Sequence, residues 1–186
     1  MKSLNNKITS ISERDELTRQ FEYVNSLIER HRFNAITKVN IEVLLTSWEV
    51  GEYISIQLKT SRWGSKVVSE LADYLKLQNP QRRGFGKRNM YNTVQLFEMY
   101  SEKEFILLTD SLHLNEIVQL PTAQLKVNEF NKNIPSILTI TTFSNHVEIM
   151  NRCSTYEERI FYMLYAYHQN ISTEELRRCI VNQTYA

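Results

Sequence analysis

The apolar residues of this chain recur mostly every three or four positions, the spacing that places side chains on one face of an α-helix. A first stripe follows Ser12 and Asp15, which are typical of a helix start. It consists of Leu17, Phe21, Val24, Leu27 and Ile28. A second stripe consists of Val39, Val43, Leu44, Trp48, Ile54 and Leu58. We therefore expect one very long helix up to about Lys59, or two nearly collinear helices with a kink near Thr37 or Gly51.

The next two apolar groups predict a pair of shorter helices around a turn. The first helix contains Val67, Val68, Leu71 and Leu75. It should end before Asn79-Pro80, because the residue before a proline is disfavoured in the α region. The turn contains Gly84-Phe85-Gly86, and the second helix carries Met90, Val94 and Phe97 on one face. A helix, a glycine-containing turn and a second helix are the outline of a helix-turn-helix.

The remainder predicts a connector followed by three helices. Residues 105–142 contain two prolines and scattered β-branched side chains, which favour a connector with a short hairpin or wing. One helix is expected over residues 144–152, and two more should begin at the capping-box sequences of residues 154–157 and 172–175. The predicted fold class is mainly α: a long N-terminal helix plus a winged helix-turn-helix in residues 1–140, with a C-terminal helical extension in residues 141–186.

Charge is concentrated in one segment. The whole chain has a formal net charge of +1. Residues 59–90, however, hold eight Lys and Arg residues against two Asp and Glu residues, whereas the rest of the chain holds more acidic than basic residues. A local excess of positive charge in an otherwise acidic chain is typical of a surface that binds a polyanion.

The predicted second helix places polar side chains opposite its apolar face. Arg and Lys contact phosphates or guanine, and Asn and Gln pair with adenine, so these side chains suit a recognition helix in the major groove. The candidate nucleic-acid-binding residues are Arg82, Arg83, Lys87, Arg88, Tyr91, Asn92 and Gln95. The alternative is a solvated basic turn, and the residue pattern alone favours neither.

A longer ordered set of residues resembles a known family. Its N-terminal part comprises Val39-Asn40, Leu44-Leu45, Trp48, Ile54, residues 63–68, Leu71, Leu75, Gly84-Phe85, residues 88–90 and Tyr100. Its C-terminal part comprises residues 143–146, Glu157-Glu158-Arg159, Phe161-Tyr162 and residues 175–178. This set resembles the N-terminal domain of the YhcG-like family of bacterial proteins, a domain of unknown function. Two departures from that pattern are Gly86 in place of a serine, and residues 143–146 in place of Trp-Ser-His.

The resemblance implies a winged helix-turn-helix that is usually followed by a PD-(D/E)XK nuclease domain, and this chain ends where that domain would begin. We therefore expect DNA as a partner, together with a C-terminal nuclease domain or a separate nuclease. Trp48, Trp63, Phe85 and Met90 are expected in the core, because aromatic and Met side chains at helical spacing usually pack. Asn89 is expected to cap or brace the turn.

Other classes find little support in the sequence. There is no secretory signal or membrane span, so we expect a cytoplasmic protein with reduced thiols at Cys153 and Cys179. The histidines, His31, His113, His146 and His168, are far apart in sequence, and no zinc spacing occurs. We expect no metal, no cofactor and no catalytic site, and hence not an enzyme.

The sequence therefore predicts a DNA-binding module, the targeting part of a nuclease system. The alternative is a protein-interaction or oligomerisation module without direct nucleic-acid contact. In that case the long N-terminal helix and the tyrosine-rich tail would bind a partner or form a homo-oligomer. The tail tyrosines are Tyr156, Tyr162, Tyr165 and Tyr167.

Overall fold

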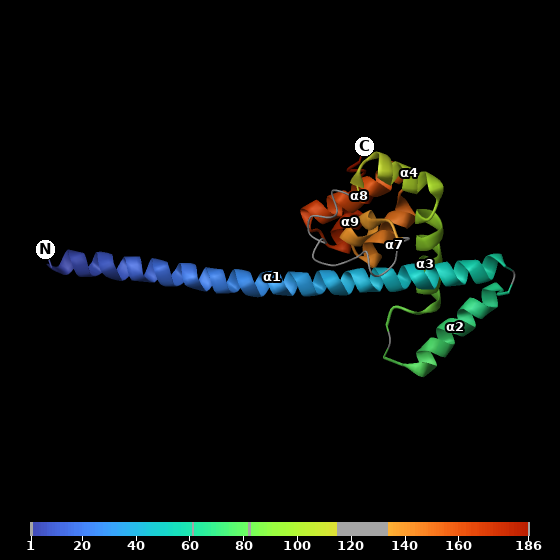
Figure 1. Ribbon diagram of the computed structural model, residues 1–186, viewed down its shortest axis with the longest axis horizontal. Helices are drawn as coiled ribbons and strands as arrows, with labels where there is room; N and C mark the ends of the chain where they lie inside the picture. The colour runs from blue at the N-terminus through green and yellow to red at the C-terminus, as the bar shows by residue number, and fades with distance from the viewer. Residues whose placement is uncertain (1, 61, 82, 115–133, 186) are drawn as a thin grey trace. The chain divides into compact units, whose positions relative to one another are not determined.

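The computed structural model describes residues 2–60, 62–81, 83–114 and 134–185, with the backbone alone for residues 2–13 and for residue 65. Figure 1 shows its elements. They are α1 (Lys2–Lys59), α2 (Ser65–Gln78), α3 (Lys87–Tyr100), α4 (Lys103–Ser111), the 3-10 helix η2 (Ser136–Ile140), α7 (Phe143–Arg152), α8 (Tyr156–Gln169) and α9 (Thr173–Val181). The described residues contain no strand. The mainly α fold class is thus confirmed.

The chain divides into two compact units, residues 1–39 and residues 40–186. The long N-terminal helix is confirmed, but its start near Ser12 is wrong, because α1 begins at Lys2. The segment before Ser12 contains neither proline nor glycine, so no residue in it interrupts a helix. Within residues 14–39 the hydrogen bonds and ion pairs are local, such as those from Thr18 Oγ1 to the Arg14 carbonyl and between Arg32 and Glu29.

In the second unit α3 lies between two clusters of buried side chains. One cluster joins α3 to α1 and α2 and consists of Ile54, Val68, Ala72, Met90 and Val94. Half-buried Trp63 and Phe85 pack against it. The larger cluster joins α3 to the C-terminal helices; it includes Trp48, Leu96, Tyr100, Phe105, Leu138, Ile149, Tyr162 and Leu176. Trp48, Trp63, Phe85 and Met90 are therefore core residues, as predicted. The larger cluster contains side chains from both regions named in the sequence analysis, residues 1–140 and residues 141–186.

Helix α1 crosses α3 at Gly51. A Cβ atom on Gly51 would lie 2.0 Å from the Thr93 carbonyl oxygen, so only glycine permits this approach. On one side of the crossing the rings of Trp48 and Phe97 meet edge to face at 5.1 Å. On the other side Ser55, buried, donates a 2.7 Å hydrogen bond from its Oγ to Glu98 Oε1. These contacts fix α3 against the second half of α1.

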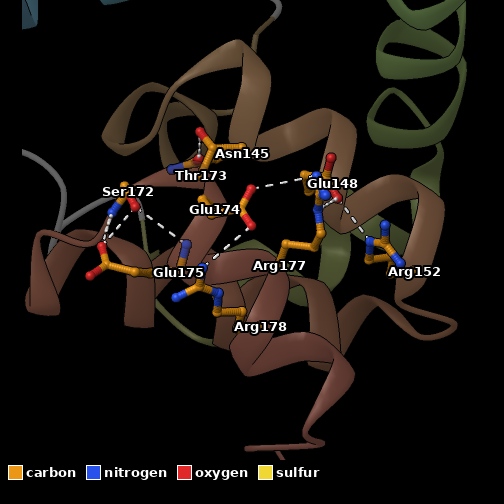
Figure 2. Close-up of polar contacts among 9 residues, drawn as sticks. All are labelled: Asn145, Glu148, Arg152, Ser172, Thr173, Glu174, Glu175, Arg177 and Arg178. Atoms are coloured by element: carbon orange, nitrogen blue, oxygen red, sulfur yellow. Dashed lines mark hydrogen bonds and ion pairs between the residues drawn. The ribbon is translucent and has the colours of Figure 1, made fainter.

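Polar side chains connect α7 and α9, as Figure 2 shows. Glu148 on α7 accepts from Arg152 Nε at 2.8 Å and lies 3.6 Å from Arg177 Nε on α9. Asn145 Oδ1 accepts a 2.6 Å hydrogen bond from Thr173 Oγ1 across the same helices. The α7–α9 pair is therefore held by ion pairs and hydrogen bonds as well as by the core.

Side-chain caps begin the last two helices. The capping box at Ser172 and Glu175 is confirmed in full. At α8 the prediction was one residue early: the cap is Thr155, which accepts from the Glu158 amide, while Glu158 Oε2 accepts from the Ser154 amide. Glu158 and Glu175 both belong to the C-terminal part of the family pattern. Because both carboxylates accept from backbone amides at a helix start, their role is local and structural.

The predicted connector is helical at both described ends. Residues 103–111 form α4, with Phe105 fully buried, and residues 136–140 form η2, with Ile137 and Leu138 buried. The apolar periodicity of the segment is weak and did not predict these helices, but burial of the apolar side chains stabilises them. The hairpin or wing was predicted within residues 105–142. The described parts of that segment, residues 105–114 and 134–142, contain no strand, and residues 115–133 lie outside the described residues. Both cysteines are free, as predicted.

Among the described residues no helix is both long enough and apolar enough to cross a membrane.

Candidate nucleic-acid interface

The connection between α2 and α3 comprises residues 79–86, longer than the three or four residues of a compact helix-turn-helix. Gly84 adopts a φ of 89°, in the left-handed region that favours glycine. The Asn89 side chain then donates a 3.1 Å hydrogen bond from Nδ2 to the Gly84 carbonyl. Asn89 therefore braces the turn from the first turn of α3, as the sequence suggested.

The first turn of α3 presents cations to solvent. Lys87, Arg88 and, just before them, Arg83 are exposed. Gly86 is the N-cap and has no side chain, so no side-chain oxygen of the N-cap accepts from the first amides of α3. Cations here oppose the helix dipole, which is positive at this end, and their placement costs the isolated helix some stability.

Ion pairs divide the basic segment. Lys59 Nζ lies 3.2 Å from Glu98 Oε1, and Lys66 Nζ lies 3.5 Å from Glu70 Oε1. The other described cations of residues 59–90 have no carboxylate within 4.0 Å among the described residues. They are Arg62, Lys76, Arg83, Lys87 and Arg88. Arg82 lies outside the described residues.

The other three candidates lie further along α3. Tyr91 is exposed, whereas Asn92 and Gln95 are half-buried. Asn92 donates a 3.3 Å hydrogen bond from Nδ2 to Asn89 Oδ1, which extends the brace of the turn. Tyr91 and Gln95 line an open groove of about 510 Å³ between α3 and the start of α8. Lys87 and Arg88 thus lie in the exposed first turn of α3, Arg83 lies in the connection before it, and Tyr91 and Gln95 lie further along α3 at the groove.

The far end of the groove carries charges of both signs. Glu98 and Glu102 line it together with Tyr156 and Arg159 of α8. Tyr156 donates a 2.5 Å hydrogen bond from its hydroxyl to Glu102 Oε2. Burial and this carboxylate raise the pKa of Tyr156 to about 12, so the hydroxyl stays protonated near neutral pH.

Glu98 lines the groove, and the sequence did not single it out. It lies three residues beyond Gln95, and it accepts from Ser55 and pairs with Lys59. Its spacing from Tyr91 and Gln95 places all three on one side of α3. That spacing was visible in the sequence, but Lys59 as a partner depends on the crossing of α1 and α3.

His146 is a core residue. It is fully buried on α7, and its Nε2 lies 2.8 Å from the Leu138 carbonyl oxygen. A carbonyl only accepts, so Nε2 carries the proton in the neutral ring. Burial lowers the pKa of His146 to about 4. In the part of the chain that the structure describes, no group of three His, Cys, Asp or Glu side chains could hold a metal ion.

The comparisons with known proteins agree with the resemblance noted in the sequence. A family model described as the DUF1016 N-terminal domain matches residues 23–186. No curated protein matches the chain, and no solved structure does. The family that the sequence resembled, the YhcG-like N-terminal domain, is confirmed by this match.

Proposed function

The chain belongs to the DUF1016 N-terminal domain family, and from this premise we propose that it is a DNA-binding module, the targeting part of a nuclease system. The observation that carries the proposal is the group of exposed cations at the start of α3, namely Arg83, Lys87 and Arg88. They have no carboxylate partner among the described residues. A phosphate backbone supplies the charge that they lack.

The framework around these cations supports the proposal. Helix α3 packs against buried clusters on two sides, and Asn89 braces the turn before it. A rigid helix whose N-terminal residues are exposed suits insertion into the major groove. Tyr91, Asn92 and Gln95 follow at the positions from which side chains would read base edges.

The proposed module binds and does not cut. Catalysis would come from a nuclease domain or a separate nuclease, as the YhcG-like resemblance implies. The alternative is a protein-interaction module that does not touch nucleic acid. The two are separated by measuring affinity for a duplex directly.

The experiment is a titration of fluorescent duplex DNA, followed by anisotropy, at several salt concentrations. Each phosphate contact should contribute about −0.9 to the slope of log affinity against log salt. Changing four cations to alanine removes at least three such contacts if the proposal holds, so the slope should flatten by about three units. Those four are Arg82, Arg83, Lys87 and Arg88. Changing Asn92 or Gln95 should alter sequence preference and leave the slope nearly unchanged.

A matched control removes the same number of positive charges elsewhere. Four exposed cations of α1 serve for this purpose: Arg14, Arg19, Arg30 and Lys38. Their replacement by alanine should leave the salt slope within about one unit of the original. If both variants bind a duplex as the unaltered chain does and remain helical by circular dichroism, the interaction-module alternative takes the place of DNA binding. Single-stranded RNA in a parallel titration distinguishes RNA from duplex DNA as the preferred ligand.

A further inference from the structure

Helix α1 exposes an apolar stripe within residues 14–39, interrupted at Arg32. Leu17, Ile28 and Val39 recur every eleven residues, which is close to three helical turns, so they lie on one line along the helix. Phe21 and Val24 lie between the first two, and Ala35 is the equivalent of Val24 in the next repeat. The five larger side chains are 49% to 63% exposed. We refer to Leu17, Phe21, Val24, Ile28, Ala35 and Val39 as the α1 stripe.

An apolar face of this kind usually reflects a partner surface. Most of the stability of an amphipathic helix comes from packing its apolar face, because helix propensity alone is marginal. In the second half of α1 the apolar side chains do pack: Leu44, Trp48 and Ile54 are buried. The α1 stripe is likewise apolar, but its larger side chains are exposed.

The charges around the stripe narrow the choice of partner. Residues 14–39 contain five Lys and Arg residues and four Asp and Glu residues. A helix that lies on an anionic membrane carries a strongly basic polar face, and a nucleic-acid-binding helix carries a basic excess. The nearly balanced charges favour neither. Arg32 stands at the position equivalent to Phe21 and pairs with Glu29 at 3.9 Å, so its charge is held at the edge of the stripe.

We propose that a second copy of this chain covers the α1 stripe, so that two α1 helices pair along residues 17–39. The repeat of eleven residues makes the stripe regular over its length, so that identical surfaces interdigitate in an isologous contact. With about 100 Å² still exposed on each larger side chain, two copies would bury on the order of 1,000 Å². That area is at the lower limit of specific interfaces, and we expect a dissociation constant in the micromolar range.

The test measures mass against concentration for the full chain, without DNA, by sedimentation velocity. The unaltered chain should pass from monomer to dimer between about 1 and 100 µM. The double change Phe21→Glu and Ile28→Glu places four carboxylates in the pair and should weaken dimerisation at least about 100-fold. The matched control is Phe33→Glu with Ile36→Glu, because these side chains are 55% and 53% exposed on the same helix but lie off the stripe.

The control variant should dimerise like the unaltered chain, and circular dichroism should show equal helix content in both variants. A chain that stays monomeric at about 100 µM overturns the proposal irrespective of the variants. So does equal weakening by the two pairs of substitutions. Flotation of a monomer with vesicles that contain one anionic lipid in three would assign the stripe to a membrane surface instead. Because no arm of the test contains DNA, its failure leaves the proposed DNA contact untouched.

Discussion

Carboxylates of Glu148 and Glu174 lie within 3.7 Å of the three arginines on α7 and α9, which are Arg152, Arg177 and Arg178. The cations at the start of α3 have no such partner among the described residues. To bind a phosphate, an arginine of the first group must give up an ion pair, whereas a cation of the second group gives up only water. Two surfaces with the same kind of side chain thus differ in their availability to a polyanion. We refer to them as the α7–α9 network and the α3 basic end.

The largest expected difference between the two regions is their response to pH. Arg and Lys side chains ordinarily titrate at alkaline pH. On the α7 side, burial holds the pKa of His146 at about 4, below the usual 6.5 of the unfolded chain. The unfolded chain therefore binds a proton between these values that the folded chain does not. Stability should fall by about 3 kcal/mol as the pH drops from about 6.5 to 4.

Denaturant titrations at several pH values measure this loss. The variant His146→Gln retains a donor for the Leu138 carbonyl but has no proton to bind, so its stability should depend less on pH over that range. His168 is exposed, and His168→Gln is the matched control that should keep the full dependence. Identical pH profiles for the two variants would contradict the assignment to His146.

The second prediction concerns the crossing of α1 and α3, which holds α3 and its basic end in place. Gly51→Ala should destabilise the fold by about 2 kcal/mol, because the new Cβ would lie 2.0 Å from the Thr93 carbonyl oxygen. This cost is net of the better helix propensity of alanine, about 1 kcal/mol. At Gly64 nothing lies within 4 Å of a Cβ, and Gly64→Ala should cost under about 1 kcal/mol. Equal free energies of unfolding for the two variants would refute the close crossing of α1 and α3.

The third prediction compares one arginine from each region in its effect on stability and on DNA binding. Arg177 lies 3.5 Å from Glu174 and 3.6 Å from Glu148, with its side chain 43% exposed, so Arg177→Ala should cost about 0.5 to 1 kcal/mol of stability. It should leave DNA affinity unchanged. Arg88→Ala should do the reverse: stability within about 0.5 kcal/mol, and a salt slope flatter by about 0.9. Loss of DNA affinity in Arg177→Ala alone would place the interface on the α7–α9 network.

Much of this fold follows from local sequence signals. The apolar spacing predicted α1, α2 and α3, and Asn79-Pro80 predicted the end of α2, because each depends on residues near in sequence. The helical ends of the predicted connector were missed: Phe105 and Leu138 become buried only against α3, α7 and α8, which are distant in sequence. The start of α1 was misplaced because a capping pattern at Ser12 does not exclude a helix that has already begun.

The candidate site shows the same limit. The sequence identified Arg83, Lys87 and Arg88 as a charged group and Asn89 as a brace, all within one turn and its helix. It could not pair Lys59 with Glu98 or place Tyr91 and Gln95 at a groove that α8 completes. It also treated both halves of α1 as equivalent stripes. Periodicity identifies an apolar face, but which partner covers that face depends on the tertiary or quaternary contacts.

The smallest expected effect is at the cap of α3. Gly86 has φ −74° and ψ 165°, a conformation open to any residue, and nothing lies within 4 Å of its Cβ position. Gly86→Ser restores the serine that the YhcG-like pattern has here. Its hydroxyl can accept from the Arg88 or Asn89 amide, which should raise stability by a few tenths of a kcal/mol. The DNA affinity should stay within about twofold, because the proposed contacts are side chains rather than these amides. Thermal unfolding and anisotropy on the same preparation measure both quantities. A tighter fold with clearly weaker binding would show instead that phosphate contacts the free amides at the start of α3.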